Sequence, residues 1–413
     1  MSFYGLLSEA VFSTARPYLC RKYDEGNEQR YGNYPATLPR GAVWIHAVSV
    51  GEVQSAYPFV KEIKSQSPDI SLLLSTITKT GKVMSEQLMG DLVNRIYYPW
   101  DAPSILEKTL KTLAPRAYIT CETEIWPGML EELQKHSIPA FLVNGRLSQK
   151  SFKKYCRLKS FWRKVIRRYT LITARSEDER SRFIALGADE DKVKVTGDCK
   201  VDALINRRKS TDVRTLDWLF DENPVVLAGS THEGEDPVIF DAYSSLLKRH
   251  PSLKLIVAPR HPERAESIIA LAENWGMKAC LFSNEPKEWK VLVIDRIGVL
   301  FSLYTHVKAA FIGGSLVQKG GQNVMEPAIW GVPCCQGPDY HDFTVATEGL
   351  MSAGLCKIVH GASDIVKFFD YALKTNDKEN FEKRSEAFFD SLGGASRRNW
   401  ELIQSAIEAN GEA

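Results

Sequence analysis

The chain has 413 residues, which is more than one hydrophobic core usually accommodates and therefore favours two domains. Its composition is that of an ordinary globular protein, 44% hydrophobic and 25% charged, and its formal net charge of +2 excludes a globally basic nucleic-acid-binding protein. The eight cysteines form no CxxC pair, so neither a disulfide framework nor a zinc site is predicted, and a reducing cytoplasm fits best.

The N-terminal segment has neither the positive leader nor the apolar core of a signal peptide, and no stretch approaches the roughly 18 to 20 apolar residues that span a bilayer. On a helix, six of its apolar residues would gather on one side: Phe3, Leu6, Leu7, Ala10, Val11 and Phe12. Such a helix can lie in a membrane interface or pack on the body of the protein, and the sequence favours neither arrangement.

Short apolar, β-branched runs alternate with helical patterns in both halves of the chain. In the first half these runs lie at 42–50, 70–78, 95–100, 116–124, 138–145, 169–176 and 192–198. After a polar stretch they resume at 225–231, 253–261, 291–297, 309–316 and 355–361. This alternation predicts an α/β protein with parallel sheets and crossover helices.

We therefore predict two Rossmann-like domains, 1–205 and 224–390, joined by a linker at 206–223 that can act as a hinge. Because continuous apolar strands are buried on both faces, each domain should be an open, doubly wound parallel sheet. Ligands of such sheets bind beyond the carboxyl ends of the strands, so both domains are expected to face one central cleft.

Three carboxylates in the first half end or follow predicted strands. Glu52 opens a helix directly after the first run, where it either complements the helix dipole or acts as a general base whose pKa is raised by apolar neighbours. Glu122 and Glu124 should share one face of a strand, because strand side chains repeat every two residues. They can form an acid/base pair, bind a sugar hydroxyl, or cap the helix that Pro127 begins.

Polar segments also follow predicted strands in the second half. Ser230, Thr231 and His232 precede a helix, and the amide-rich turn there can hold a phosphate. Arg260 and His261 come after the next strand, where Arg260 either binds an anionic ligand or forms an internal ion pair. A third segment has glycines for close backbone approach and a carboxylate for a ribose diol: Gly313, Gly314, Ser315, Asn323 and Glu326. Its glycine spacing is not the dinucleotide fingerprint, which disfavours a dehydrogenase.

A basic segment lies between the strands at 138–145 and 169–176. Eight Lys and Arg residues occur between Phe152 and Tyr169 without an acid, interleaved with apolar residues at helical spacing. The segment therefore predicts an amphipathic helix that binds anionic lipid headgroups or a phosphorylated lipid acceptor, or that packs on the core with a solvated charged face. Its candidate contact residues are Lys153, Lys154, Arg157, Trp162, Arg163, Lys164, Arg167 and Arg168.

Seven motifs occur in order: HAVSVGE, YYPWD, ETEIWP, NGRLS, GSTHEGE, APRHPER and GGSLVQKGGQNVMEPA. Together they resemble the bacterial 3-deoxy-D-manno-octulosonic acid (Kdo) transferases of lipopolysaccharide biosynthesis, over about residues 40 to 350. The resemblance implies a GT-B fold and inverting transfer from CMP-Kdo to a lipid A precursor, tetraacyldisaccharide 4'-phosphate (lipid IVA). It implies no metal and no cofactor, no nucleic acid partner, and peripheral contact with the anionic inner membrane at its cytoplasmic face.

The resemblance also implies roles for residues. Glu52 is the base for the acceptor hydroxyl, Glu122 or Glu124 supports it, and the second-half motifs hold CMP. Lys200 either meets the sugar carboxylate or is a surface residue. By the same likeness, residues 391–413 can form a helix that returns to the first domain.

The chain departs from the family pattern at three places. Gln322, Val324 and Met325 occupy a stretch normally close to GGHNPLEP, Asp198-Cys199 stands where Asn-Leu is common, and GPDYHDF is atypical. Two other functions remain as alternatives. One is another GT-B nucleotide-sugar enzyme such as an epimerase, which needs no basic lipid-facing segment. The other is a noncatalytic lipid-binding protein, which has no need of Glu52.

Overall fold

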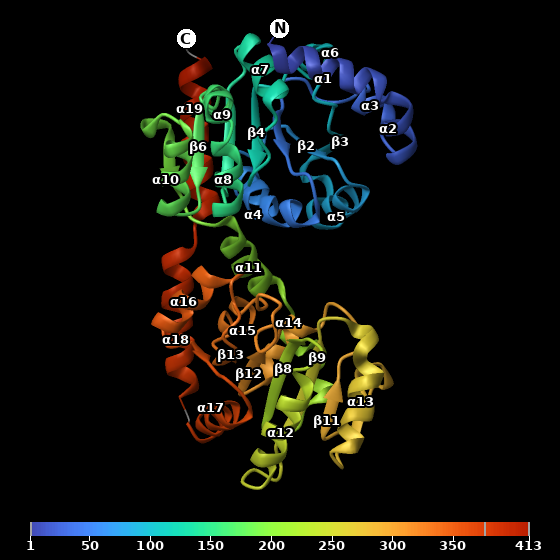
Figure 1. Ribbon diagram of the computed structural model, residues 1–413, viewed down its shortest axis with the longest axis vertical. Helices are drawn as coiled ribbons and strands as arrows, with labels where there is room; N and C mark the ends of the chain where they lie inside the picture. The colour runs from blue at the N-terminus through green and yellow to red at the C-terminus, as the bar shows by residue number, and fades with distance from the viewer. Residues whose placement is uncertain (1, 376, 412–413) are drawn as a thin grey trace. The chain divides into compact units, whose positions relative to one another are not determined.

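The computed structural model describes residues 2–375 and 377–411. The chain divides into two compact α/β units (Figure 1). Unit 1 contains the residues up to Ala203 together with those from Leu392 on, and unit 2 contains Leu204–Ser391. The first unit is therefore built from two separate stretches of the chain.

Unit 1 is built on a seven-stranded parallel sheet of order β3-β2-β1-β4-β5-β6-β7. Its strands are β1 (Val43–His46), β2 (Leu72–Thr76), β3 (Asn94–Tyr97), β4 (Ala117–Cys121), β5 (Ala140–Gly145), β6 (Leu171–Ala174) and β7 (Val193–Val195). Each apolar run predicted in the first half overlaps one of them. The order reverses between β1 and β4, so the carboxyl ends of these two strands form the switch point where such sheets bind ligands.

Helices cover both faces of this sheet. They are α1 (Phe3–Thr14), α2 (Arg16–Lys22), α3 (Asn27–Arg30), α4 (Val50–Gln66), α5 (Lys79–Met89), α6 (Pro103–Leu113), α7 (Pro127–Lys135), α8 (Gln149–Cys156), α9 (Lys159–Ile166), α10 (Glu177–Leu186), α11 (Cys199–Ser210), which continues into unit 2, and α19 (Ala395–Gly411). Val43 and Ile45 of β1 pack with α4 and α19, whereas Trp44 packs with α6 and α7. Strand side chains alternate between the faces, so unit 1 has two hydrophobic cores.

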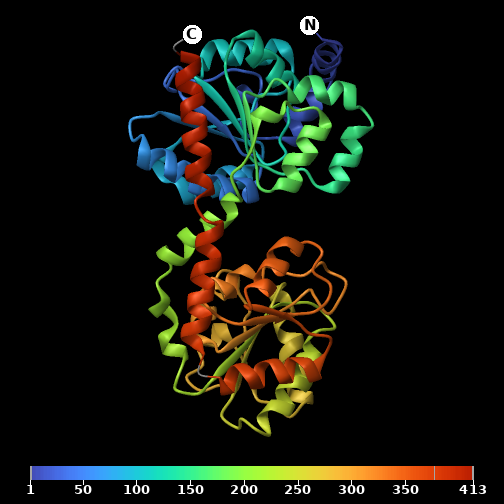
Figure 2. The same ribbon diagram turned by 90° about the vertical axis from the view of Figure 1, so that its left-hand side faces the viewer.

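The helix α19 completes one of these cores. Figure 2 shows it running along the first sheet, and its Trp400 and Ile403 are fully buried against α4 and the strands. Asp202 accepts hydrogen bonds from the backbone N–H groups of Gly394 (2.7 Å) and Ser396 (2.6 Å), which fixes the start of α19. The end of the described chain is thus part of the same hydrophobic core as β1.

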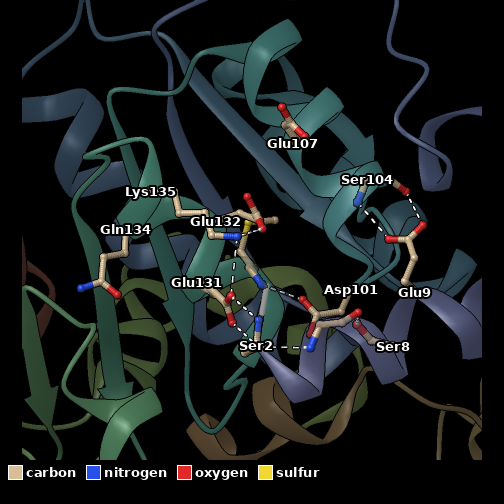
Figure 3. Close-up of polar contacts among 12 residues, drawn as sticks. Ser2, Ser8, Glu9, Asp101, Ser104, Glu107, Glu131, Glu132, Gln134 and Lys135 are labelled. Atoms are coloured by element: carbon tan, nitrogen blue, oxygen red, sulfur yellow. Dashed lines mark hydrogen bonds and ion pairs between the residues drawn. The ribbon is translucent and has the colours of Figure 1, made fainter.

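Polar contacts hold α1 to α6 and α7 (Figure 3). The Ser2 hydroxyl donates to Glu131 Oε2 at 2.5 Å, and the backbone N–H of Ser104 donates to Glu9 Oε2 at 3.0 Å. The Tyr4 hydroxyl donates to Asp101 Oδ2 at 2.7 Å, and Asp101 also accepts the first N–H groups of α7. The Phe12 ring also stacks on Trp100, with the centroids 5.5 Å apart, so polar and aromatic contacts together hold the inner side of α1.

The basic segment forms two helices, α8 and α9, so the prediction of one amphipathic helix is wrong. The turn between them lies at Arg157 and Leu158, where Leu158 has φ −122° and ψ 42°. The break lets the rings of Tyr155 and Trp162 meet at 4.4 Å while both pack against the core. No helix in residues 2–375 and 377–411 is both long and apolar enough to cross a membrane.

Unit 2 repeats the architecture of unit 1, with a seven-stranded parallel sheet of order β10-β11-β9-β8-β12-β13-β14. Its strands are β8 (Val225–Thr231), β9 (Lys254–Pro259), β10 (Ala279–Leu281), β11 (Val291–Val293), β12 (Ala309–Ile312), β13 (Cys334–Gln336) and β14 (Cys356–Ile358). The switch point lies between β8 and β12. The prediction of two doubly wound parallel sheets is confirmed.

The helices of unit 2 are α12 (Asp236–Leu247), α13 (Ala265–Asn274), α14 (Leu300–Leu303), α15 (Met325–Ala328), α16 (Thr344–Ser352), α17 (Ala362–Lys374) and α18 (Lys378–Leu392). Buried residues of α12, α13 and α17 pack on one face of the sheet, against Val226, Val257 and Phe311. All eight cysteines of the chain are free thiols.

Candidate functional site

Glu52 lies in the first turn of α4, just beyond the carboxyl end of β1. Its half-buried carboxylate accepts a hydrogen bond from the backbone N–H of Val48, which turns the side chain back over the start of its own helix. Burial, and then the negative charges of Glu124 and Glu122, raise the pKa of Glu52 to about 7. Near neutral pH this carboxylate is therefore available as a proton acceptor.

Glu122 follows β4, the strand beside β1 at the switch point. The expectation that Glu122 and Glu124 share a strand face is wrong, because β4 ends at Cys121 and Glu122 has a left-handed φ of 58°. This turn breaks the two-residue alternation. It leaves the buried Glu122 carboxylate 3.1 Å from the Ser55 hydroxyl, which donates to it, and 2.8 Å from the Lys200 ammonium.

Glu124 is the third carboxylate of this cluster. Burial raises its pKa, the charge of Glu122 adds to the effect, and a hydrogen bond with Trp126 opposes it. The structure thus brings Glu52, Glu122 and Glu124 close enough to influence one another, with Lys200 as the cation paired to Glu122.

An aromatic stack supports the cluster. The His46 ring at the end of β1 lies 3.8 Å from the Tyr98 ring, centroid to centroid, and 6.1 Å from that of Trp126. Burial lowers the pKa of His46 to about 3, so this histidine is neutral and a poor base near pH 7. Its ring instead packs against the loop that carries Glu124.

Arg175 was not singled out from the sequence, although it lies within the predicted run at 169–176 and directly follows β6. Its guanidinium binds Glu179 through two nitrogens, at 2.6 and 3.1 Å, and Asp198 at 3.1 Å. Asp198 in turn accepts the backbone N–H of Lys200 at 2.9 Å. This network fixes the turn from which Lys200 reaches Glu122.

In unit 2, Ser230, Thr231 and His232 lie at the carboxyl end of β8. Ser230 has a left-handed φ of 56°, and Thr231 is buried. The His232 and His261 rings lie 5.8 Å apart, and burial lowers the pKa of His232. Arg260 and His261 follow β9 and are exposed. The amide-rich turn is occupied from within the chain, because the His232 N–H donates to Glu235 at 2.8 Å.

The glycine segment follows β12, beside β8 at the switch point. The backbone N–H groups of Gly314 and Ser315 also donate to Glu235, at 2.7 and 3.0 Å. Gly313 also packs closely against the loop after β8, because a Cβ there would lie 2.5 Å from the carbonyl oxygen of Ser230. Three predicted residues, Gly313, Gly314 and Ser315, thus meet the loop after β8.

Asn323 and Glu326 are occupied by partners in unit 2. Asn323 Oδ1 accepts the backbone N–H of Met325 at 3.1 Å, which helps to cap α15. Glu326 pairs with Arg207 at 3.0 Å, while burial raises the Glu326 pKa. The Arg207 guanidinium lies 4.0 Å from the ring centroid of Phe301. Arg207 was not identified from the sequence, because its partner Glu326 lies 119 residues later in the chain.

The cations of α8 and α9 fall into two groups. Arg167 pairs with Asp189 at 3.0 Å and Arg168 with Glu131 at 3.6 Å, so both are engaged within unit 1. The side chains of another group are exposed: Lys153, Lys154, Arg157, Arg163 and Lys164. Trp162 is half-buried against the core.

Comparison with known proteins identifies the family. The profile described as 3-deoxy-D-manno-octulosonic-acid transferase (kdotransferase) matches residues 25–203. The 3-deoxy-D-manno-octulosonic acid transferase of Haemophilus influenzae is 33% identical over 389 residues, which cover 92% of this chain and 90% of that protein. The chain belongs to the Kdo transferase family. Another Kdo transferase, from Chlamydia muridarum, is 28% identical over 88% of this chain and 86% of its own length.

Among solved structures, the UDP-GlcNAc 2-epimerase of Neisseria meningitidis has a TM-score of 0.64 to this Kdo transferase family member. The match covers 88% of this chain and 100% of that one at 17% identity, so it concerns the fold alone. The fold is GT-B, as the resemblance implied, and the family resemblance itself is confirmed. The chain is a glycosyltransferase of this family.

Proposed function

We propose that this chain transfers Kdo from CMP-Kdo to a lipid A precursor, tetraacyldisaccharide 4'-phosphate (lipid IVA), with inversion at the anomeric carbon. Family membership supports Kdo as the transferred sugar. The observation that carries the catalytic part is Glu52, a half-buried carboxylate at the switch point of a sheet with a pKa of about 7.

In the proposed reaction Glu52 takes the proton of the acceptor hydroxyl as its oxygen attacks the anomeric carbon of Kdo. The bond from this carbon to the phosphate oxygen breaks, and CMP leaves with the bonding electrons. Attack from the face opposite the phosphate gives inversion. Burial, together with the charges of Glu124 and Glu122, keeps the pKa of Glu52 high enough for proton transfer near neutral pH.

We assign the two substrates to different parts of the chain. Residues 1–205 carry the base and bind the acceptor, 206–223 form a linker, 224–390 bind CMP-Kdo, and 391–413 belong to the acceptor-binding part. Lys200 pairs with Glu122 in unit 1, which supports a role beside the base, where it can meet the sugar carboxylate. The proposed donor contacts are Ser230, Thr231, His232, Arg260, His261, Asn323 and Glu326, and Gly313, Gly314 and Ser315 form the loop beside which the donor lies.

Peripheral attachment to the cytoplasmic face of the inner membrane is part of this proposal. The exposed cations of α8 and α9 can bind anionic headgroups, and the outer side of α1 adds apolar surface. Its side chains are exposed by 84% (Phe3), 59% (Leu6), 54% (Leu7) and 49% (Val11). Since polar contacts and the stack of Phe12 on Trp100 already hold the inner side of α1, the outer apolar side is left for lipid.

The test is CMP release from CMP-Kdo by the purified chain, with and without tetraacylated lipid A precursor in detergent and with a chelator present. We expect release that requires the lipid and persists in chelator. In Glu52→Gln, turnover should fall at least about 1000-fold while CMP still binds. Lipid-independent turnover of a UDP-sugar would support an epimerase instead, and wild-type turnover by Glu52→Gln would remove Glu52 from the mechanism.

A further inference from the structure

Four backbone N–H groups of unit 2 converge on the carboxylate of Glu235. Oε2 accepts from His232 at 2.8 Å and from Gly314 at 2.7 Å, and Oε1 accepts from Ser315 and Leu316 at 3.0 Å each. The residue is completely buried. Within the described residues no Lys, Arg or His forms an ion pair with it, so these N–H groups supply the stabilisation of its buried charge.

This arrangement is an anion site filled by a side chain of the protein itself. Consecutive N–H groups that point to one centre commonly hold a phosphate or another anion. Here the loop after β8 supplies one N–H and the loop after β12 supplies three. The single carboxylate therefore ties together the two loops that meet at the switch point of the second sheet.

Other contacts hold the same loop in place. The Gly313 N–H donates to the Gly229 carbonyl at 2.8 Å, and the Ser315 hydroxyl accepts the Gly337 N–H at 2.8 Å. With Glu235 taking the next three amides, each N–H from Gly313 to Leu316 has an internal acceptor. These amides are not available to a ligand.

Side chains lie on the other side of the same backbone. A Cβ at Gly314 would lie 3.2 Å from the His232 ring and 3.3 Å from Gln322, and these two side chains are 3.4 Å apart, between their Nε2 atoms. Gly314 has a left-handed φ of 68°, which suits a residue without a Cβ. The loop thus separates the buried carboxylate from a partly exposed polar pair.

We infer that Glu235 is a positioning residue for the sugar-nucleotide donor. It takes the place of an anion among four amides and so holds the Gly313–Leu316 loop in the form that binds the donor. The donor's phosphate is then bound by side chains in front of the loop, His232 and Gln322 among them, and not by these amides. This inference rests on the proposed function, in which unit 2 binds CMP-Kdo.

Glu235→Gln in the full chain tests the role of the charge. The amide side chain keeps one acceptor oxygen, but its NH₂ group opposes two of the backbone N–H groups. Calorimetry should show CMP binding weakened at least about tenfold. Glu233→Gln makes the same charge change at an exposed site two residues away, and it should bind CMP within about twofold of wild type.

Glu235→Ala separates positioning from general damage, because it leaves a carboxylate-sized space lined by four N–H groups. Formate should bind there, slow hydrogen exchange of the 314–316 amides and restore part of the CMP affinity, whereas chloride at equal ionic strength should restore less. Wild-type CMP affinity in Glu235→Gln, tighter CMP binding in Glu235→Ala, or no effect of formate on exchange would each overturn the inference. Failure of the wild-type chain to bind CMP would count against the proposed function instead, because the exchange measurement needs no nucleotide.

Discussion

The ionisation of Glu52 should determine how kcat/KM changes with pH on the acidic side of the profile. With Glu52 as the base, kcat/KM should rise with pH until about 7 and then level, as the carboxylate becomes ionised. The charge of Glu124 contributes to this raised pKa, so Glu124→Gln should move the rise to lower pH. Initial rates of CMP release between about pH 5 and 9 measure both profiles.

Glu107→Gln is the matched control for this shift, because Glu107 is an exposed carboxylate paired with Lys111 on α6. Its profile should coincide with that of the wild type. If Glu124→Gln left the rise where it is, the electrostatic coupling between Glu124 and the base would be refuted.

The raised pKa of Glu52 also predicts a difference in stability between the wild type and Glu52→Gln. Since the folded-state pKa of Glu52 lies above the ordinary value of 4.5, folding favours the protonated form, and stability is lost as pH rises through about 7. Glu52→Gln stays neutral. It should exceed the wild type in free energy of unfolding by about 1–2 kcal/mol near pH 8, allowing for solvent screening, and match it near pH 4.

Urea denaturation at the two pH values measures this difference. A variant that is equally stable or less stable than the wild type near pH 8 would show that Glu52 is not held in an unfavourable ionised state.

The role of a single residue could be predicted where the residues next to it in the sequence indicate its place in the fold. Glu52 stands at a strand-to-helix junction that the local sequence reveals. Ser55 and Arg207 are different, because their partners Glu122 and Glu326 lie 67 and 119 residues away. Glu235 is part of the GSTHEGE motif, but its role could not be predicted from the sequence. Three of the four backbone N–H groups that donate to it belong to residues about 80 positions later in the chain.

The exposed cations of α8 and α9 give a prediction about membrane binding. Each Lys or Arg near an anionic bilayer contributes about 1 kcal/mol, so replacing four of them by Gln should weaken binding to anionic vesicles at least about 100-fold. The four are Lys153, Lys154, Arg157 and Lys164. Flotation with phosphatidylglycerol vesicles at low salt measures the loss, which should shrink as salt rises.

A second quadruple variant controls for net charge. It replaces four exposed lysines of unit 2 by Gln: Lys248, Lys278, Lys287 and Lys308. Vesicle binding should be nearly unchanged in this variant. Equal losses in both would mean that overall charge, and not the α8–α9 surface, draws the protein to lipid.

Among elements, apolar β-branched runs predicted both sheets, while short or irregular elements were missed. The strands β10 and β13 have three residues each, and the sequences ACL and CCQ show neither a β-branched run nor alternation. The break between α8 and α9 was missed because apolar spacing continues across it, so the sequence shows no sign of the turn at Arg157 and Leu158.

For the whole molecule, the stability of unit 1 depends on a helix that follows unit 2 in the sequence. Trp400 of α19 is fully buried beside Phe59 of α4, with ring centroids 6.4 Å apart. Trp400→Ala should lower the free energy of unfolding of unit 1 by about 3–5 kcal/mol, because a large cavity opens in its core. Denaturation followed by CD and tryptophan fluorescence measures the loss.

Trp275→Ala is the control, since Trp275 is 39% exposed at the end of α13. Its cost should stay below about 1 kcal/mol. Similar costs at the two positions would mean that α19 contributes little to the core of unit 1.

The placement of α19 also bears on how the chain is made. A ribosome delivers residues in order, so Phe59 and β1 emerge long before Trp400 covers them, with all of Leu204–Ser391 in between. At typical bacterial rates the interval between the synthesis of Phe59 and that of Trp400 lasts roughly 20–70 s. During it the half that carries Glu52 is unfinished and exposes apolar surface. A truncated messenger RNA that ends after unit 2 would therefore yield a chain in which the domain that carries the proposed base is not stably folded. Only a chain translated beyond Trp400 would be active.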